Sequence, residues 1–337
     1  MPFTNGVYSQ YDLEAAKILN DFLPDRIFDS HLHLFDSSFA PGIAKGGGFN
    51  VSTRADFQDY LDFIKPLLGE HRQVRGNFIT APDATMTEPN SPNRKASVEF
   101  LVQQLDQFPG NVGEVMVGPK DTVEDIENLL IHPDIRGFKC YHVTAENKPT
   151  TQAAIGEYLP ESAWQVANQR GMVITLHMVK DRSLADPENY EYILQMAKRY
   201  PNAKLILAHC ARAFAAWTGV EMVDKIKHLD NVYYDFSAIC ESPAMFQILR
   251  KVGKDKCMWG SDFPVCRLSG KAISLADSFY WINANILEQL GNPNIPYWQY
   301  STENLMAVRQ ACLMLDLSQD RVEDLFWNNA MKLFDLK

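Results

Sequence analysis

The chain has 337 residues, of which 46% are hydrophobic and 22% charged, an ordinary composition for a globular protein with a sizeable core. The 32 basic and 42 acidic residues give a net charge of −10, which argues against a protein that binds nucleic acid through a basic face. No apolar stretch reaches the length of a membrane-spanning helix, and the N-terminus lacks the basic and apolar pattern of a signal peptide.

The cysteine pattern is typical of a protein of the reducing cytoplasm. The cysteines form no Cys-x-x-Cys pair, and most lie in or beside apolar strand-like runs, which is typical of reduced core thiols rather than disulfides. We therefore expect a cytoplasmic protein with no membrane partner. The six residues are Cys140, Cys210, Cys240, Cys257, Cys266 and Cys312.

The first 26 residues contain one amphipathic stretch, LEAAKILNDFL. We expect residues 1–26 to form a helical extension that either covers the main domain or contacts a second subunit in a homodimer. The sequence shows no linker, repeat or low-complexity tract, so residues 27–337 are predicted to form one domain.

Short apolar runs then alternate with amphipathic stretches along the chain. Eight alternating strands and helices are the pattern of a (β/α)8 TIM barrel, so the predicted fold is an α/β barrel in a single domain with extra N- and C-terminal helices. The predicted strands are 27–35, 74–82, 112–118, 135–143, 172–178, 203–210, 232–238 and 256–264.

Several of the intervening helices have recognisable start and stop signals in the sequence. One is predicted from Pro160 to Gly171, one between Asp186 and Pro201, and one from Ser242 to Gly253. A polar cap, an early proline and a terminal glycine or proline are the usual helix boundaries. The residues at 271–290 and 303–334 are also predicted to be helical.

A doubly wound open sheet is the rival architecture, but it usually has a glycine-rich phosphate turn after its first strand. The first predicted strand has no such turn after it. The triple glycine Gly46–Gly48 lies too far from a helix start to hold a phosphate, and we interpret it as a surface loop, with a lid over the barrel mouth as the alternative.

The segment IFDSHLHLF, residues 27–35, places His31 and His33 on one face of an apolar strand, because side chains two apart point the same way. Their nitrogens can share one target, and imidazole is the commonest protein ligand of transition metals. The alternative is a pair of core histidines satisfied by hydrogen bonds.

Three more polar residues lie at the ends of later strands: His177, His209 and Asp262. Active sites of such barrels gather at the carboxyl ends of the strands, so all five side chains are expected to converge there. His142 follows the fourth strand and is expected to line the rim or to be surface-exposed.

This set resembles the amidohydrolase superfamily, and more closely its amidohydrolase-2 branch, which includes aminocarboxymuconate-semialdehyde decarboxylase, resorcylate-type decarboxylases and sugar or pyrone lactonases. The segments DSHLHLF, LILAHC and WGSDFP and the closing VEDLFWNNAMKLFDL carry the resemblance, which covers nearly the whole chain.

The resemblance implies one divalent metal ion bound by His31, His33, His177 and Asp262. Zinc suits such a set, and manganese or iron would be tolerated. Asp262 would also accept a proton from water. His209 would act as general acid or base or polarise a carbonyl, the alternative being a ligand of a second metal.

Two alternative roles are considered for each of three further residues. Lys139, on the fourth strand, would hold a substrate carboxylate or carbonyl, although in some relatives such a lysine is carboxylated and bridges two metals. Arg212 would clamp a substrate carboxylate or pair with a surface acid. Asp235 is interpreted as a structural residue or as an acceptor for a metal-bound histidine.

Three functions follow from different classes. The first, which we favour, is a metal-dependent hydrolase of a small carbonyl substrate such as a lactone or amide. The second is a metal-dependent non-oxidative decarboxylase of a small carboxylic acid, and the third is a metal-binding barrel without catalysis. Fold analogy does not choose between the first two.

Overall fold

The computed structural model describes residues 6–45, 52–276, 278–283, 286, 289 and 297–337. All eight predicted strands are present, although most of them are shorter than the residue ranges predicted from the apolar runs. They are β1 (Arg26–Asp36), β3 (Gln73–Thr80), β4 (Val112–Met116), β5 (Ile135–Cys140), β6 (Val173–Leu176), β7 (Lys204–Leu207), β8 (Val232–Asp235) and β9 (Cys257–Met258).

These strands form one parallel sheet in the order β1-β3-β4-β5-β6-β7-β8-β9. The short strand β2 (Arg54–Ala55) was not predicted, and it pairs antiparallel with the end of β1. Backbone hydrogen bonds between β1 and the segment after β9 close the sheet on itself: the Asp262 amide donates to the His31 carbonyl at 2.8 Å, and the His33 amide to the Phe263 carbonyl at 2.8 Å. The predicted TIM-barrel fold is confirmed.

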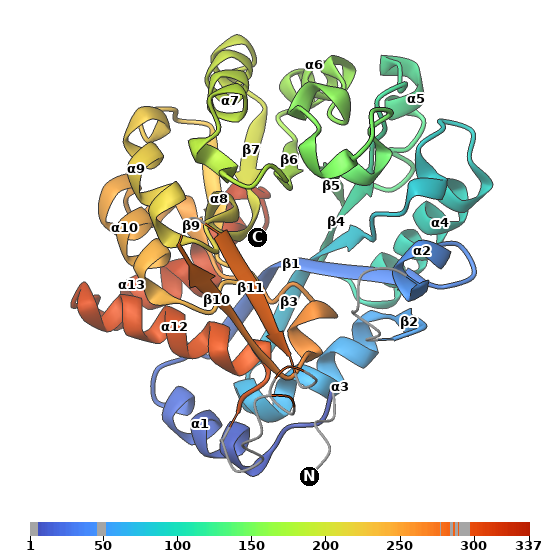
Figure 1. Ribbon diagram of the computed structural model, residues 1–337. Coiled ribbons are helices and arrows are strands. Elements are labelled where there is room, and N and C mark those ends of the chain that lie inside the picture. The colour runs from blue at the N-terminus through green and yellow to red at the C-terminus, as the bar shows by residue number, and fades with distance from the viewer. Residues whose placement is uncertain (1–5, 46–51, 277, 284–285, 287–288, 290–296) are drawn as a thin grey trace.

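Helices surround the strands, as Figure 1 shows. The helix predicted in the first 26 residues forms α1, which packs against α3 and α12. The main helices are α1 (Gln10–Asn20), α3 (Phe57–Leu68), α4 (Pro92–Gln107), α5 (Val123–Glu127), α6 (Glu161–Arg170), α7 (Pro187–Arg199), α9 (Ala216–Ile226), α10 (Ser242–Val252), α12 (Tyr300–Met314), α13 (Gln319–Glu323) and α14 (Asn329–Leu333).

The helix boundaries follow the predicted signals with one correction. Gly171 caps the end of helix α6, and its φ of 67° is the left-handed conformation that favours glycine. At the start of α7 the Asp186 side chain accepts the amide of Glu188. Ser242, which the sequence suggested as the cap of α10, lies inside its first turn, and its hydroxyl donates to Gln310 instead.

The prediction of a helix over 271–290 is wrong for the described residues up to 283, whereas residues 286 and 289 are helical. The strands β10 (Gly270–Leu275) and β11 (Ser278–Asn283) pair antiparallel as a hairpin. The aromatic and β-branched run in SFYWIN favours a strand, and its alternation leaves Phe279 and Trp281 on the same face. The hairpin lies across the barrel in Figure 1. The Gly46–Gly48 loop lies outside the described residues.

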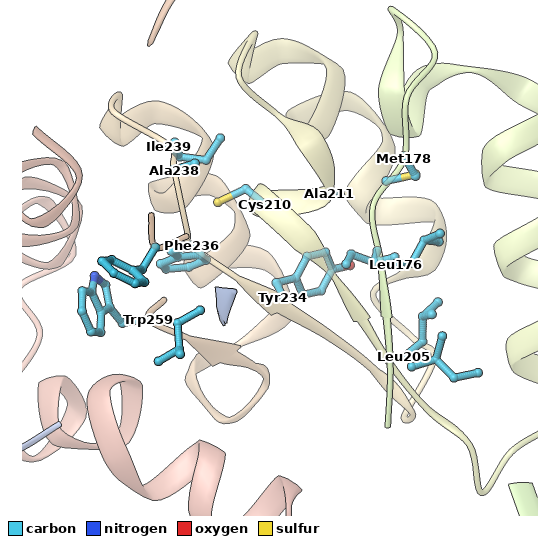
Figure 2. Packing of buried hydrophobic residues seen from close by; sticks show 14 of the residues in the cluster. Leu176, Met178, Leu205, Cys210, Ala211, Tyr234, Phe236, Ala238, Ile239 and Trp259 are labelled. Atoms are coloured by element: carbon cyan, nitrogen blue, oxygen red, sulfur yellow. The ribbon is translucent and has the colours of Figure 1, made fainter. Parts of the chain in front are cut away.

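The core has two parts. The larger lies between the strands and the surrounding helices, where Leu176, Leu205 and Tyr234 pack in one hydrophobic cluster with Trp259 (Figure 2). The smaller fills the amino end of the barrel, where Phe28 packs with Trp327 and Phe334 of the C-terminal segment. None of the described helices is both long and apolar enough to cross a membrane.

Candidate metal centre and active site

The predicted site residues gather at the carboxyl end of the barrel, where the backbone is strained. Four consecutive residues after β7, His209 to Arg212, have φ between 54° and 61°, and Asp262 has φ 59°. A left-handed conformation costs a residue other than glycine about 1–2 kcal/mol. Such strain persists where the surrounding structure enforces it, and it concentrates at functional sites.

Three side chains converge at the centre of this end. The Nε2 atoms of His31 and His33 lie 3.2 Å apart, and Asp262 Oδ1 lies 3.7 Å from each of them. All three side chains are buried. The two-residue spacing on β1 therefore has the predicted effect, and the strained turn after β9 brings the carboxylate to the same point.

The orientation of His31 is fixed from behind. Its Nδ1 lies 2.9 Å from Asp235 Oδ2, and a carboxylate oxygen is an acceptor, so we assign the proton to Nδ1. The lone pair is therefore on Nε2, which faces His33 and Asp262. Asp235 thus lies behind a predicted metal ligand, in agreement with one of its two predicted roles.

These residues fit a single divalent ion. Two nitrogens bound to one zinc at 2.0–2.1 Å in a tetrahedral arrangement lie about 3.3 Å apart, close to the observed 3.2 Å. A second group of metal-competent residues, His31, His209 and Asp235, lies on the other side of the His31 ring. His31 Nδ1 and the His209 backbone amide both donate to Asp235, and His209 Nδ1 lies 2.9 Å from the Ser237 hydroxyl, so we interpret this group as a network that orients the two rings.

His177, the fourth predicted ligand, stands slightly apart. It is not part of the group in which His31, His33 and Asp262 atoms all lie within 4.8 Å of one another. Its Nδ1 is buried and has no hydrogen-bond partner among the described residues, and its ring lies 5.1 Å from that of His209. An unpartnered buried nitrogen at this place suits a ligand, so its role stays a prediction.

His209 is held by Ser237, which lies two residues after the end of β8. Its Nδ1 lies 3.1 Å from the Ser237 carbonyl oxygen and 2.9 Å from the Ser237 hydroxyl. A carbonyl only accepts, so Nδ1 carries the proton and Nε2 carries a lone pair. Burial, assisted by the positive field of neighbouring groups, lowers the pKa of His209 to about 3, so the ring is neutral at pH 7.

Asp29 links the two segments that carry the central ligands. Its Oδ1 accepts the amides of His31 at 3.0 Å and of Ser261 at 2.9 Å. Burial raises the pKa of Asp29 to about 6. Burial also raises the pKa of Asp262 well above its usual value, and the positive charge of Lys139 opposes that shift.

Lys139 is buried beneath the cluster and is not a residue of the cavity wall. Its Nζ lies 3.1 Å from His31 Nε2, and burial lowers its pKa. The predicted contact with substrate therefore remains a prediction.

Close by, Glu114 accepts from Asn77 and Thr175 in the barrel interior, and burial raises the pKa of Glu114 to about 7.

The cluster opens into a cavity of about 510 Å³, which is the size of a small-molecule site. Arg212 lines it, with its guanidinium 5.1 Å from the Phe279 ring and 3.4 Å from the Lys180 carbonyl oxygen. Among the described residues Arg212 forms no ion pair, which leaves its charge for a ligand. The cavity wall consists of His33, Phe35, Gly42, Ile43, Ala81, Pro82, Asp83, Ala84, Tyr141, His142, Val143, Thr151, His177, Val179, His209, Arg212, Phe214, Asp262, Pro264, Val265, Phe279 and Trp281.

Several site residues were not predicted from the sequence. Glu114 carried a signal, because it is a lone carboxylate inside the apolar run VGEVMVG. Ser237 also carried one, since it follows Asp235 by two on the same predicted strand. Phe279 and Trp281 were hidden by the wrong helix prediction. His142, by contrast, lies on the cavity rim as one of its two readings expected, with Nδ1 3.0 Å from Thr150 Oγ1.

Comparisons with solved structures support the fold. A zinc-containing amidohydrolase from Burkholderia multivorans aligns with a TM-score of 0.59 at 15% identity, covering 92% of this chain and 99% of that one. A putative 2-pyrone-4,6-dicarboxylic acid hydrolase from Pseudomonas putida aligns with a TM-score of 0.55 at 15% identity, covering 93% and 98%.

A manganese-bound 5-carboxyvanillate decarboxylase from Novosphingobium aromaticivorans aligns with a TM-score of 0.56 at 13% identity, covering 94% of this chain and 98% of that one. No protein of curated function matches the sequence. The Amidohydro_2 family, described as amidohydrolase, matches residues 28–336. The chain therefore belongs to the Amidohydro_2 family of amidohydrolases, whose barrel fold it shares.

Proposed function

We propose that this protein is a metal-dependent hydrolase that attacks the carbonyl of a small lactone or amide with activated water. The observation that carries the proposal is the convergence of His31 Nε2, His33 Nε2 and Asp262 Oδ1 beside a neutral His209 at a cavity mouth. A divalent ion held there by His31, His33, Asp262 and His177 would polarise the carbonyl and lower the pKa of water from 15.7 towards about 7.

The chain's own residues supply proton transfer. Asp262, whose Oδ1 lies 3.7 Å from both His31 Nε2 and His33 Nε2, would accept the proton of the attacking water. His209 has its lone pair on Nε2, because Nδ1 carries the proton and donates it in a hydrogen bond to the Ser237 carbonyl oxygen. It can therefore take a proton and pass it to the leaving group.

A neutral His209 with a lone pair on Nε2 can accept a proton that water activation releases. Once protonated, the same ring could also deliver a proton to a carbon that loses CO₂, so His209 serves both candidate reactions. Hydrolysis is the preferred candidate because Asp262, beside the proposed metal, suits water activation. Decarboxylation stays the second candidate because Arg212 offers a half-buried positive charge to a substrate carboxylate.

The substrate is expected to be small and to carry an anionic group. The cavity volume limits its size, and Phe214, Phe279 and Trp281 provide apolar contacts around the Arg212 guanidinium. A carboxylate bound to Arg212 would compensate a charge that has no acidic partner among the described residues.

The test combines metal analysis with a reaction screen. Purified protein is expected to hold about one divalent ion per chain and to open lactones without releasing CO₂. The screen includes aromatic and muconate-like acids with CO₂ detection. His177→Ala should lose metal and activity together, whereas His209→Asn should lose activity and keep metal. Release of CO₂ from an acid would replace the hydrolase by the decarboxylase, and absence of metal without any gain on adding Zn²⁺ or Mn²⁺ would refute both.

A further inference from the structure

The contact between Lys139 and His31 raises a question of occupancy. The His31 Nδ1 proton is donated to Asp235, so the only lone pair of the ring is on Nε2. Lys139 Nζ donates to that lone pair at 3.1 Å. The proposed metal needs the same lone pair, and one lone pair binds one partner. The lysine and the metal are therefore mutually exclusive partners of His31.

Lys139 cannot leave for solvent, because its side chain is fully buried on β5. It needs another acceptor inside the barrel when the metal is bound. Three carboxylates act on its charge: Asp235, Glu114 and Asp262. Among the described residues none of them forms an ion pair with it.

Two of these carboxylates are already committed. Asp235 Oδ2 accepts from His31, and Asp235 Oδ1 accepts from the His209 amide and from Ser237. Asp262 is the proposed metal ligand. Glu114 is different, because its Oε2 is buried and has no hydrogen-bond partner among the described residues.

Glu114 also stands in a suitable place. In the register of β4 and β5, Glu114 pairs with Gly137 and Met116 pairs with Lys139, so the two charged residues are two positions apart in register along neighbouring strands. Positions 137 and 139 lie on the same face of β5. Asn77 Nδ2 at 2.7 Å and Thr175 Oγ1 at 2.8 Å both hold Glu114 Oε1, which leaves Oε2 as the free oxygen.

We propose that Glu114 is a positioning residue that accepts the Lys139 ammonium when the metal ion takes the His31 lone pair. Lys139 then has two positions: on His31 Nε2 without the metal, and on Glu114 Oε2 with it. This inference rests on the proposed metal centre and assigns Glu114 a part in metal binding without contact to the metal.

The test is a double-mutant cycle on the affinity for Zn²⁺, measured by calorimetry with a competing chelator. Lys139→Met removes the competitor and should tighten binding by about tenfold, and Glu114→Gln removes the charge that receives Lys139 and should weaken it by about tenfold. In the Lys139→Met background, Glu114→Gln should have no effect. Lys204→Met, at the amino end of β7, is the matched control and should leave the affinity unchanged.

Crystal structures of the wild type with and without Zn²⁺ test the inference without any variant. Nζ within about 3 Å of Glu114 in the zinc-bound form supports it, and Nζ still on His31 overturns it. Equal effects of Glu114→Gln in both backgrounds also overturn it. If Lys139→Met loses zinc and zinc loading of the wild type depends on bicarbonate, Lys139 is instead a carboxylated metal ligand, and the inference is overturned as well. If neither wild type nor Lys139→Met binds zinc or manganese, the proposed metal centre itself is refuted.

Discussion

The two ends of the barrel differ in a way that separates size from function. The amino end has the larger cavity, about 1080 Å³, lined by groups such as His132, Arg136 and Asp230, whereas the carboxyl end has about 510 Å³. The smaller cavity holds the converging imidazoles and the left-handed turns at His209 and Asp262. Converging buried polar groups, rather than volume, mark the end where chemistry is expected, since the amino-end cavity also has a left-handed residue, Asp335.

The largest expected effect tests whether a carboxylate matters at one end and not at the other. Asp262→Asn keeps an oxygen for the metal but removes the proton acceptor, so turnover of the metal-saturated enzyme should fall by about 10²–10⁴-fold. Asp230→Asn makes the same change beside the amino-end cavity and should leave turnover unchanged. Steady-state kinetics across pH on the substrate found by the screen measure both. Wild-type turnover with an unchanged acidic limb in Asp262→Asn would move proton transfer to His209.

The next effect concerns a carboxylate behind a ligand. Asp235→Asn weakens the acceptor of the His31 Nδ1 proton, so affinity for Zn²⁺ should fall by about 10–100-fold. Asp134, which lies 3.5 Å from Arg136 at the amino end, is the matched site, and Asp134→Asn should bind zinc like the wild type. Chelator competition gives both affinities. Similar losses in the two variants would indicate a general effect on folding.

A third comparison uses pH and the metal-free protein. The pKa of His209 is about 3 in the folded state against 6.5 for an ordinary histidine, so its contribution to stability is present above pH 6.5 and is lost as the pH falls towards 3. At pH 5 this loss amounts to about 2 kcal/mol.

His209→Asn should therefore reduce the difference in unfolding free energy between pH 7.5 and pH 5 by about 2 kcal/mol. Urea denaturation at the two pH values measures it. A wild-type difference in His209→Asn would contradict the assignment of a buried neutral ring.

The smallest effect compares two left-handed residues. Ala211 has φ 61° at the site, and Gly171 has φ 67° at the amino end, where an added Cβ would meet nothing within 4 Å. Gly171→Ala should destabilise by about 1 kcal/mol. In Ala211→Gly the relieved strain is offset by a lost buried methyl group of about 0.8 kcal/mol, so stability should change less. Thermal denaturation ranks the two, and a larger loss in Ala211→Gly would show that its turn is not strained.

The parts predictable from sequence depend on local patterns. Because side chains two residues apart on a strand point the same way, the sequence predicted that His31 and His33 share one face. The apolar runs located all eight strands. The hairpin over the mouth was missed because its alternating aromatic residues were taken for an amphipathic helix. The contacts of Lys139 with His31 and of Glu114 with Asn77 were beyond sequence reasoning, because they join separate strands and depend on barrel register.

The closure of the barrel also determines when the site can exist during synthesis. The hydrogen bond from the Asp262 amide to the His31 carbonyl joins the first strand of the barrel to the segment after the last. The nearby bond from the Ser30 hydroxyl to the Trp259 carbonyl spans 229 residues. A ribosome must therefore release almost the whole barrel before His31 and Asp262 can meet. Nascent chains that end before residue 262 contain His31 and His33 without Asp262, so the proposed metal ion could be retained only after the last strand has left the exit tunnel.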